Sequence, residues 1–172
     1  MARPRRTPAD RTSTLIKEWS AQRPGESVAI QSVRTQLLLL GTRIARDNDS
    51  MARTLGVTGP ELGVLLALRR QGTPYCLRPA DLLDALLVPS SSMTRQLDKL
   101  EAQRLVARCV DPEDGRGKLV RLTAAGVTLA DRAIPRMLKQ SVVSRGLLAM
   151  QPHQVDTLDA LLRELLSGLP PG

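Results

Sequence analysis

The feature that most restricts the fold of this chain is its near lack of aromatic residues. Its 172 residues include Trp19, Tyr75 and no Phe. Hydrophobic residues still make up 42% of the chain, which is enough for an ordinary globular core. Aliphatic side chains must therefore fill nearly all of that core. Aromatic platforms for stacking unpaired bases are missing, which argues against an RNA-recognition or single-strand-binding module.

Positive charge is the second constraint. Lys and Arg number 25 against 17 Asp and Glu, which gives a formal net charge of +8 at pH 7. Such an excess indicates a polyanionic partner, either nucleic acid or an acidic membrane surface. Part of the excess lies near the start of the chain, within residues 1–24. The charged residues there are Arg3, Arg5, Arg6, Asp10, Arg11, Lys17, Glu18 and Arg23.

Neither a membrane span nor an export signal is predicted. No apolar run approaches the roughly 20 residues of a membrane-spanning helix, and no apolar segment follows the basic start. Aromatic anchors for a membrane surface are also almost absent. The two cysteines lie far apart in the sequence, as expected for reduced thiols. We therefore expect a cytoplasmic protein with no membrane partner.

The first part of the chain predicts an arm followed by a long helix. Residues 1–26 contain three prolines and scattered charges, and Ser13 to Gln22 can form a short helix that carries Trp19. Residues 27 to about 55 form a Leu-rich helix without internal Pro. Its run of four leucines at residues 37–40 covers more than one face, so we expect burial on several sides, against a second copy of the chain.

The middle of the chain predicts short helices and a hairpin. Thr58 to Glu61 combines a cap residue, a Pro and an early acid, which predicts a helix that ends at Gly72. Residues 75–77 can form a very short strand. Two short helices follow, from Pro79 to about Val88 and from Ser90–Ser92 to about Gln103. Residues 105–110 and 118–122 are β-type runs joined by a turn-rich segment, which predicts a hairpin.

Two further helices are expected after the hairpin. One follows Thr123 and contains Pro135, which should kink it. The last runs from about Pro152 to Leu166. Two short helices joined by a tight turn and followed by a hairpin form a winged helix-turn-helix. Such a helix fits the major groove of duplex DNA, and the hairpin tip can reach an adjacent minor groove.

The second short helix has two distinct faces. At about 100° per residue, Met93, Leu97 and Leu100 fall on the core side. Arg95 and Lys99 fall on the opposite side, behind Ser91 and Ser92, whose short hydroxyls permit close approach to a phosphate. A solvated polar face is the alternative interpretation, and the adjacent hairpin favours DNA contact.

The hairpin tip places Arg116 between two glycines, Gly115 and Gly117. Arg116 is a candidate for the minor groove, with Asp114 orienting the loop or the arginine. A plain charged turn is the alternative, because residues 111–121 hold three acids and three bases.

These segments resemble the MarR family of bacterial transcriptional regulators. The similarity lies in Val88–Lys99, Leu105–Arg108, Asp111–Arg116 and Val120–Gly126. Its most specific part is Asp-x-Arg in the wing followed by Leu-Thr-x-x-Gly. The resemblance implies an obligate homodimer held by the first and the last two helices, a palindromic operator and, usually, release by a small ligand or an oxidant. By position, the DNA-contacting residues are Ser90, Ser91, Ser92, Thr94, Arg95, Lys99, Asp114, Arg116 and Lys118.

The chain also departs from the family pattern. Arg104 stands where the family usually has a Gly that closes the recognition helix in a left-handed conformation. An Arg there costs about 1 kcal/mol if that conformation persists. Gly115 and Gly117 replace bulkier or basic residues, which predicts a more flexible and less cationic wing.

The sequence says less about a small-molecule effector than about the DNA contacts. Trp19 and Pro135 resemble the urate-responsive subgroup of the family, in which a Trp, an Asp and arginines surround the ligand. Arg108 matches one of these arginines, whereas Gly63 and Gln96 stand at the Asp and the other Arg positions, which argues against urate itself. Trp19 and Arg108 are therefore the candidate effector residues. The alternative for Trp19 is a staple that holds the arm onto the body.

Other chemistries have little support. His153 is the only His, too few for a metal site, and no cofactor is implied. No glycine-rich phosphate loop or nucleophile elbow suggests an enzyme. Cys76 and Cys109 are candidates for a redox switch, but both lie in predicted strands beside apolar residues, where Cys is usually inert.

The sequence as a whole predicts a mainly helical winged helix-turn-helix with long terminal helices and one small β-hairpin. We assign residues 1–26 to a basic arm, 27–57 to a dimerisation helix, 58–123 to the DNA-binding region, 124–168 to C-terminal dimerisation helices and 169–172 to a tail. The predicted function is a homodimeric repressor that binds a palindromic duplex operator and is released by a small molecule. The alternative is an architectural DNA-binding protein without an effector.

Overall fold

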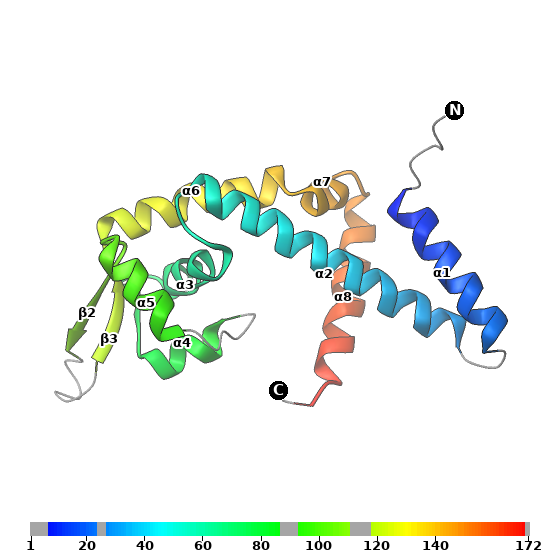
Figure 1. Cartoon of the computed structure of the whole chain (residues 1–172), viewed down its shortest axis with the longest axis horizontal. Helices are drawn as coiled ribbons and strands as arrows, with labels where there is room; N and C mark the ends of the chain where they lie inside the picture. The colour runs from blue at the N-terminus through cyan, green and yellow to red at the C-terminus, as the bar shows by residue number, and fades with distance from the viewer. Residues whose placement is uncertain (1–6, 24–26, 87–92, 111–117, 171–172) are drawn as a thin grey trace. The chain divides into compact units, whose positions relative to one another are not determined.

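The computed structural model describes residues 7–23, 27–86, 93–110 and 118–170 (Figure 1). These residues form a mainly helical chain with one small antiparallel sheet, as predicted. The helices are α1 (Pro8–Gln22), α2 (Val28–Thr54), α3 (Gly59–Arg70), α4 (Pro79–Ala85), α5 (Met93–Ala102), α6 (Ala124–Gln140), α7 (Val142–Leu148) and α8 (Pro152–Ser167). The strands are β1 (Cys76–Leu77), β2 (Val106–Val110) and β3 (Lys118–Leu122).

The chain divides into two compact units, residues 1–45 and residues 46–172. The first unit contains α1, which begins earlier than the predicted start at Ser13. Thr7 and Asp10 form a capping box, in which the Asp10 N–H donates to Thr7 Oγ1 at 3.2 Å and the Thr7 N–H donates to Asp10 Oδ2 at 2.8 Å. Pro8 then occupies the first turn, where its fixed φ favours a helix. The capping residues therefore extend this helix toward the N-terminus.

The core of the second unit is aliphatic and centres on α3. Leu62, Leu65 and Leu68 on this helix are fully buried. Thr58 and Glu61 form a capping box at its start, where the sequence predicted that a helix begins. The helix contacts α4, α5, α6 and β3, so it connects the parts of the DNA-binding region that the sequence predicted.

The sheet has the strand order β1-β3-β2, and both pairs are antiparallel. The predicted hairpin pairs Val106 with Leu122 at its base and Val110 with Lys118 at its outer end. The base joins α6 closely, because the Thr123 N–H donates to the Leu105 carbonyl at 3.1 Å and Gly126 lies against that same carbonyl, with no room for a Cβ. The residues between the strands, 111–117, lie outside the described residues.

The two short helices of the helix-turn-helix are both present in the described part of the chain. The first, α4, ends at Ala85 rather than near Val88, and Arg70 of α3 donates a hydrogen bond to the Ala85 carbonyl. The second, α5, begins at Met93. Residues 87–92, which include the predicted contacts Ser90–Ser92, are outside the described residues.

The C-terminal region contains one helix that the sequence analysis missed. Ser141 has an extended ψ of 137° and separates α6 from α7. The Asp47 carboxylate accepts hydrogen bonds from the Val142 N–H at 2.8 Å and from the Ser141 hydroxyl at 3.0 Å. An acceptor from a distant part of the chain thus stabilises the start of α7. Pro135 lies inside α6, as expected.

Arg104 has the conformation that the resemblance implied for this position. Its φ is +58°, in the left-handed region that disfavours a Cβ. The backbone is held there on both sides, because the Arg104 N–H donates to the Glu101 carbonyl at 2.8 Å and its own carbonyl accepts from the Thr123 hydroxyl at 2.7 Å. The side chain is exposed.

We predict that Arg104→Gly stabilises the protein. Relief of the left-handed strain outweighs the extra backbone freedom of Gly in the unfolded chain, for a net gain of about 0.5–1 kcal/mol. Thermal unfolding should show a midpoint about 2 °C higher. Arg104→Ala is the matched control, because it removes the same side chain but keeps the Cβ, and it should give no such gain. An equal rise of the unfolding midpoint in both variants would show that left-handed strain at Arg104 is not the cause of the gain.

We also predict that Cys76 and Cys109 do not form a disulfide within one chain. They lie on β1 and β2, on opposite sides of β3, and pair with Arg121 and Leu119. Two strand spacings amount to about 9–10 Å, beyond the roughly 7 Å limit between the Cα atoms of a disulfide. Peptide mapping after treatment with diamide should find no peptide that joins them. A Cys76–Cys109 peptide would show that the sheet rearranges.

Candidate nucleic-acid interface

The surface of α5 is divided as the sequence predicted. Met93, Leu97 and Leu100 are buried against the core. Gln96 is buried beside them. The exposed side, which we call the recognition face, consists of Thr94, Arg95, Asp98 and Lys99. This face therefore presents hydrogen-bond donors and charges on a helix whose opposite side is fixed by packing.

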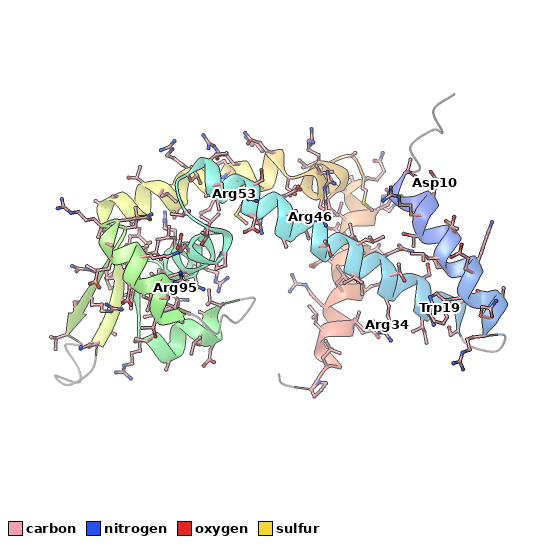
Figure 2. All side chains as sticks on the ribbon, viewed as in Figure 1. Asp10, Trp19, Arg34, Arg46, Arg53 and Arg95 are labelled. Atoms are coloured by element: carbon pink, nitrogen blue, oxygen red, sulfur yellow. The ribbon has the colours of Figure 1, made fainter. Side chains whose placement is uncertain are left out.

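Arg95 and Lys99 differ in their surroundings. Arg95 is an exposed residue of α5 (labelled in Figure 2). Lys99 leans toward the start of α3, where its Nζ lies 3.7 Å from Oε1 of the buried Glu61, whose Oε2 accepts from the Thr58 N–H at 2.8 Å. Half of the Lys99 side chain is still exposed. An ion pair of this length and exposure is weak, so Lys99 remains able to contact an anion.

A hollow of about 540 Å³ lies beside Lys99. Its lining residues are Arg53, Gly56, Val57, Thr58, Glu61, Lys99, Ala102 and Gln103. The hollow is lined by two cations, Arg53 and Lys99, and the buried Glu61 carboxylate lies 3.7 Å from Lys99. The hollow is therefore not a strongly cationic site.

Arg108 on β2 is bound to two acids of α5. Its Nη2 lies 2.6 Å from Asp98 Oδ1, its Nη1 lies 2.6 Å from Glu101 Oε2, and its backbone N–H donates to Glu101 Oε1 at 3.3 Å. The hydrogen bond to Asp98, together with the charges of both acids, raises the pKa of Arg108 above its ordinary value. Like any arginine, the guanidinium carries its positive charge at every physiological pH. We call this arrangement the Arg108 clamp.

The sequence analysis missed Asp98 and Glu101. They lie three residues apart on α5, so both can face a single cation on a neighbouring element. That spacing was visible in the sequence. The partner was not, because only the folded chain brings the middle of β2 against this side of α5.

The structure brings the described members of the predicted DNA-contacting set into one unit. Thr94, Arg95 and Lys99 lie on α5, and Lys118 is the exposed first residue of β3. The hairpin lies beside α5 (Figure 1). The other predicted contacts lie outside the described residues: Ser90, Ser91, Ser92, Asp114 and Arg116.

The candidate effector residues lie in different units. Trp19 is on α1 in the first unit and is 53% exposed. Arg108 belongs to the second unit and is held by the clamp, so an effector that contacted it would compete with Asp98 and Glu101. Their contacts with an effector stay predictions. No helix among the described residues combines the length and apolar character needed to cross a membrane.

Comparisons with known proteins agree with this geometry. The MarR family model matches residues 55–117, which include α3, α4, α5 and β2 and end before β3. The chain is 29% identical to the transcriptional regulator PecS of Dickeya dadantii over 122 residues, which cover 71% of this chain and 74% of PecS. It is 30% identical to the multiple antibiotic resistance protein MarR of Escherichia coli over 112 residues, which cover 65% of this chain and 75% of MarR.

Solved structures support the same assignment. A mutant of E. coli MarR complexed with operator DNA aligns with a TM-score of 0.65 and 25% identity, covering 80% of this chain and 96% of that one. A MarR family regulator from Streptomyces coelicolor in complex with DNA aligns with a TM-score of 0.70 over 87% of this chain and 93% of that one. At 22% identity, the second match shows the fold alone. Together with the sequence relatives, these findings show that the chain belongs to the MarR family of transcriptional regulators.

Proposed function

We propose that this protein is a homodimeric repressor that binds a palindromic operator in duplex DNA and is released by a small molecule. The observation that carries the proposal is the exposed recognition face of α5 beside an antiparallel hairpin in the same unit. The related E. coli MarR, solved with operator DNA, supports it. We place the protein in the cytoplasm, where its DNA is.

In this proposal α5 enters the major groove. Arg95 points away from the core and is the candidate for reading a base edge, since a guanidinium can bond a guanine with two hydrogen bonds. Thr94 and Lys99 contact phosphates, together with Ser90–Ser92 ahead of the helix. The hairpin, with Asp114, Arg116 and Lys118, contacts an adjacent minor groove.

The exposed apolar side chains of the long helices support a dimer. On α2 they include Ile30, Val33, Leu38, Leu39, Leu40 and Ile44, and in the C-terminal part they include Leu138, Leu148, Leu161, Leu165, Leu166 and Leu169. Large exposed apolar surfaces usually mark contacts with another protein. We therefore assign residues 27–57 and 124–168 to dimerisation, 58–123 to DNA binding, 1–26 to a basic arm and 169–172 to a tail. A two-fold axis would then place the two α5 helices about 34–36 Å apart.

The effector would act on this spacing. A ligand releases DNA only if it binds more tightly to a dimer whose recognition helices are wrongly spaced. One candidate pocket, of about 230 Å³, lies between the end of α2 and α6 and contains Asp47, Asn48 and Arg136. Trp19 and Arg108 are further candidates for effector contact.

Selection from a random duplex library tests the DNA-binding proposal. We expect one enriched palindrome with half-sites about one helical turn apart. If six or more phosphates are contacted, affinity should fall by about 10³-fold or more between 50 and 200 mM salt. If the selection finds binding but no enriched sequence, an architectural DNA-binding protein is favoured instead.

Arg95→Ala should then reduce the ratio of operator to random-duplex affinity, measured by fluorescence anisotropy. If Arg95→Ala leaves the affinity ratio unchanged, Arg95 contacts the DNA backbone and not a base.

The dimer proposal predicts that Leu165→Glu yields a monomer. Leu165 on α8 is 47% exposed in the single chain, and burying a charged side chain at that position in an interface is costly. Sedimentation equilibrium should give about the 18.7 kDa of one chain for this variant, and about twice that mass for the wild type. Leu83→Glu on α4 is the matched control, since Leu83 is also exposed but lies in the DNA-binding region. A dimeric Leu165→Glu variant would place the interface elsewhere.

A further inference from the structure

Within the described residues, apolar packing holds the inner part of the hairpin. There, Leu105, Val106, Val120 and Leu122 are buried in the core. The outer half is more exposed, and Val110 at the end of β2 is 65% exposed. Apolar packing therefore holds the inner part of the hairpin and contributes less to the position of its outer residues.

The Arg108 clamp acts where this packing ends. Arg108 is the third of the five residues of β2, and it pairs with Val120 on β3. Among the described residues it is the outermost residue of β2 that bonds to α5, through three hydrogen bonds to two acids. The guanidinium contacts to two separate carboxylates, together with the hydrogen bond from the Arg108 backbone N–H to Glu101, restrain both the position and the direction of the strand.

From this geometry we infer that Arg108 is a positioning residue, which sets the angle of the wing relative to the recognition helix without contacting DNA itself. The inference rests on the proposed DNA-binding function. It applies to the partner that this function implies, duplex DNA whose major groove receives α5 while the wing follows into the minor groove.

The clamp has a second consequence for the recognition face. Asp98 is part of that face, and its side chain is 57% exposed. An unpaired carboxylate there would repel the DNA phosphates. Arg108 offsets this charge in part, because its one guanidinium faces both Asp98 and Glu101, so loss of the Arg108 charge could weaken DNA binding by itself. The experiment must therefore separate charge from position.

Arg108→Lys makes this separation. The variant keeps the positive charge, but a single ammonium group cannot reproduce the planar fork that reaches two carboxylates. We expect its operator affinity to fall between about twofold and thirtyfold, the range for residues that act through another element. In a hydroxyl-radical footprint, the minor-groove protection by the wing should be lost while protection around the α5 contact is retained. Arg23→Lys is the matched control, because it makes the same exchange at an exposed residue outside the segments assigned to dimerisation and DNA binding, and it should change neither.

A triple variant gives the complementary test. Asp98→Asn, Glu101→Gln and Arg108→Gln together remove the clamp and its charges, so no uncompensated acid faces the DNA. We expect affinity and the wing footprint to remain impaired, while thermal unfolding changes little because the clamp is exposed. Recovery of wild-type affinity, or an unchanged footprint in Arg108→Lys, would overturn the inference. If the wild-type protein binds no duplex DNA, the proposed function is wrong, and the inference about Arg108 is wrong with it.

Discussion

The burial of one helix, α3, determines the geometry of the DNA-binding region. Its leucines at 62, 65 and 68 are inaccessible to solvent, and the helix contacts α4, α5, α6 and β3. Because the chain has almost no aromatic side chains, these aliphatic contacts must fix the relative positions of the recognition helix and the sheet. Truncating a buried Leu of this kind typically costs 2–5 kcal/mol. The same packing that holds the fold together therefore orients the surface that we propose to face DNA.

Polar contacts fix the positions of elements that lie outside this apolar core. Arg69 links α3 to α6 through Asp131 at 2.8 Å and lies over the ring of Tyr75, 4.9 Å from its centroid. Asp47 holds the start of α7. Each is exposed or partly exposed and contributes little to overall stability. These contacts instead orient neighbouring elements: Arg69 links α3 to α6, and Asp47 fixes the start of α7.

Local patterns in the sequence predicted the elements, but the contacts between them could not be predicted in the same way. The two faces of α5 follow from the spacing of Met93, Leu97 and Leu100, and the hairpin follows from two β-type runs around a turn. The strain at Arg104 was reached only through resemblance, since nothing about an Arg indicates a positive φ. The start of α7 and the role of Arg108 depend on carboxylates that are distant in sequence or on another element, so periodicity carries no information about them.

Recognition of an operator by the proposed dimer depends on two separate geometric quantities. The first is the distance between the two α5 helices, which the long helices of both copies would set. The second is the angle between each α5 and its wing, which lies within one chain. A duplex has a fixed pitch and fixed groove widths, so both quantities must be correct at the same time. A loose wing angle lowers affinity at both half-sites, because each copy carries the same fault. A clamp built from a few exposed side chains can thus influence DNA binding more than it influences folding.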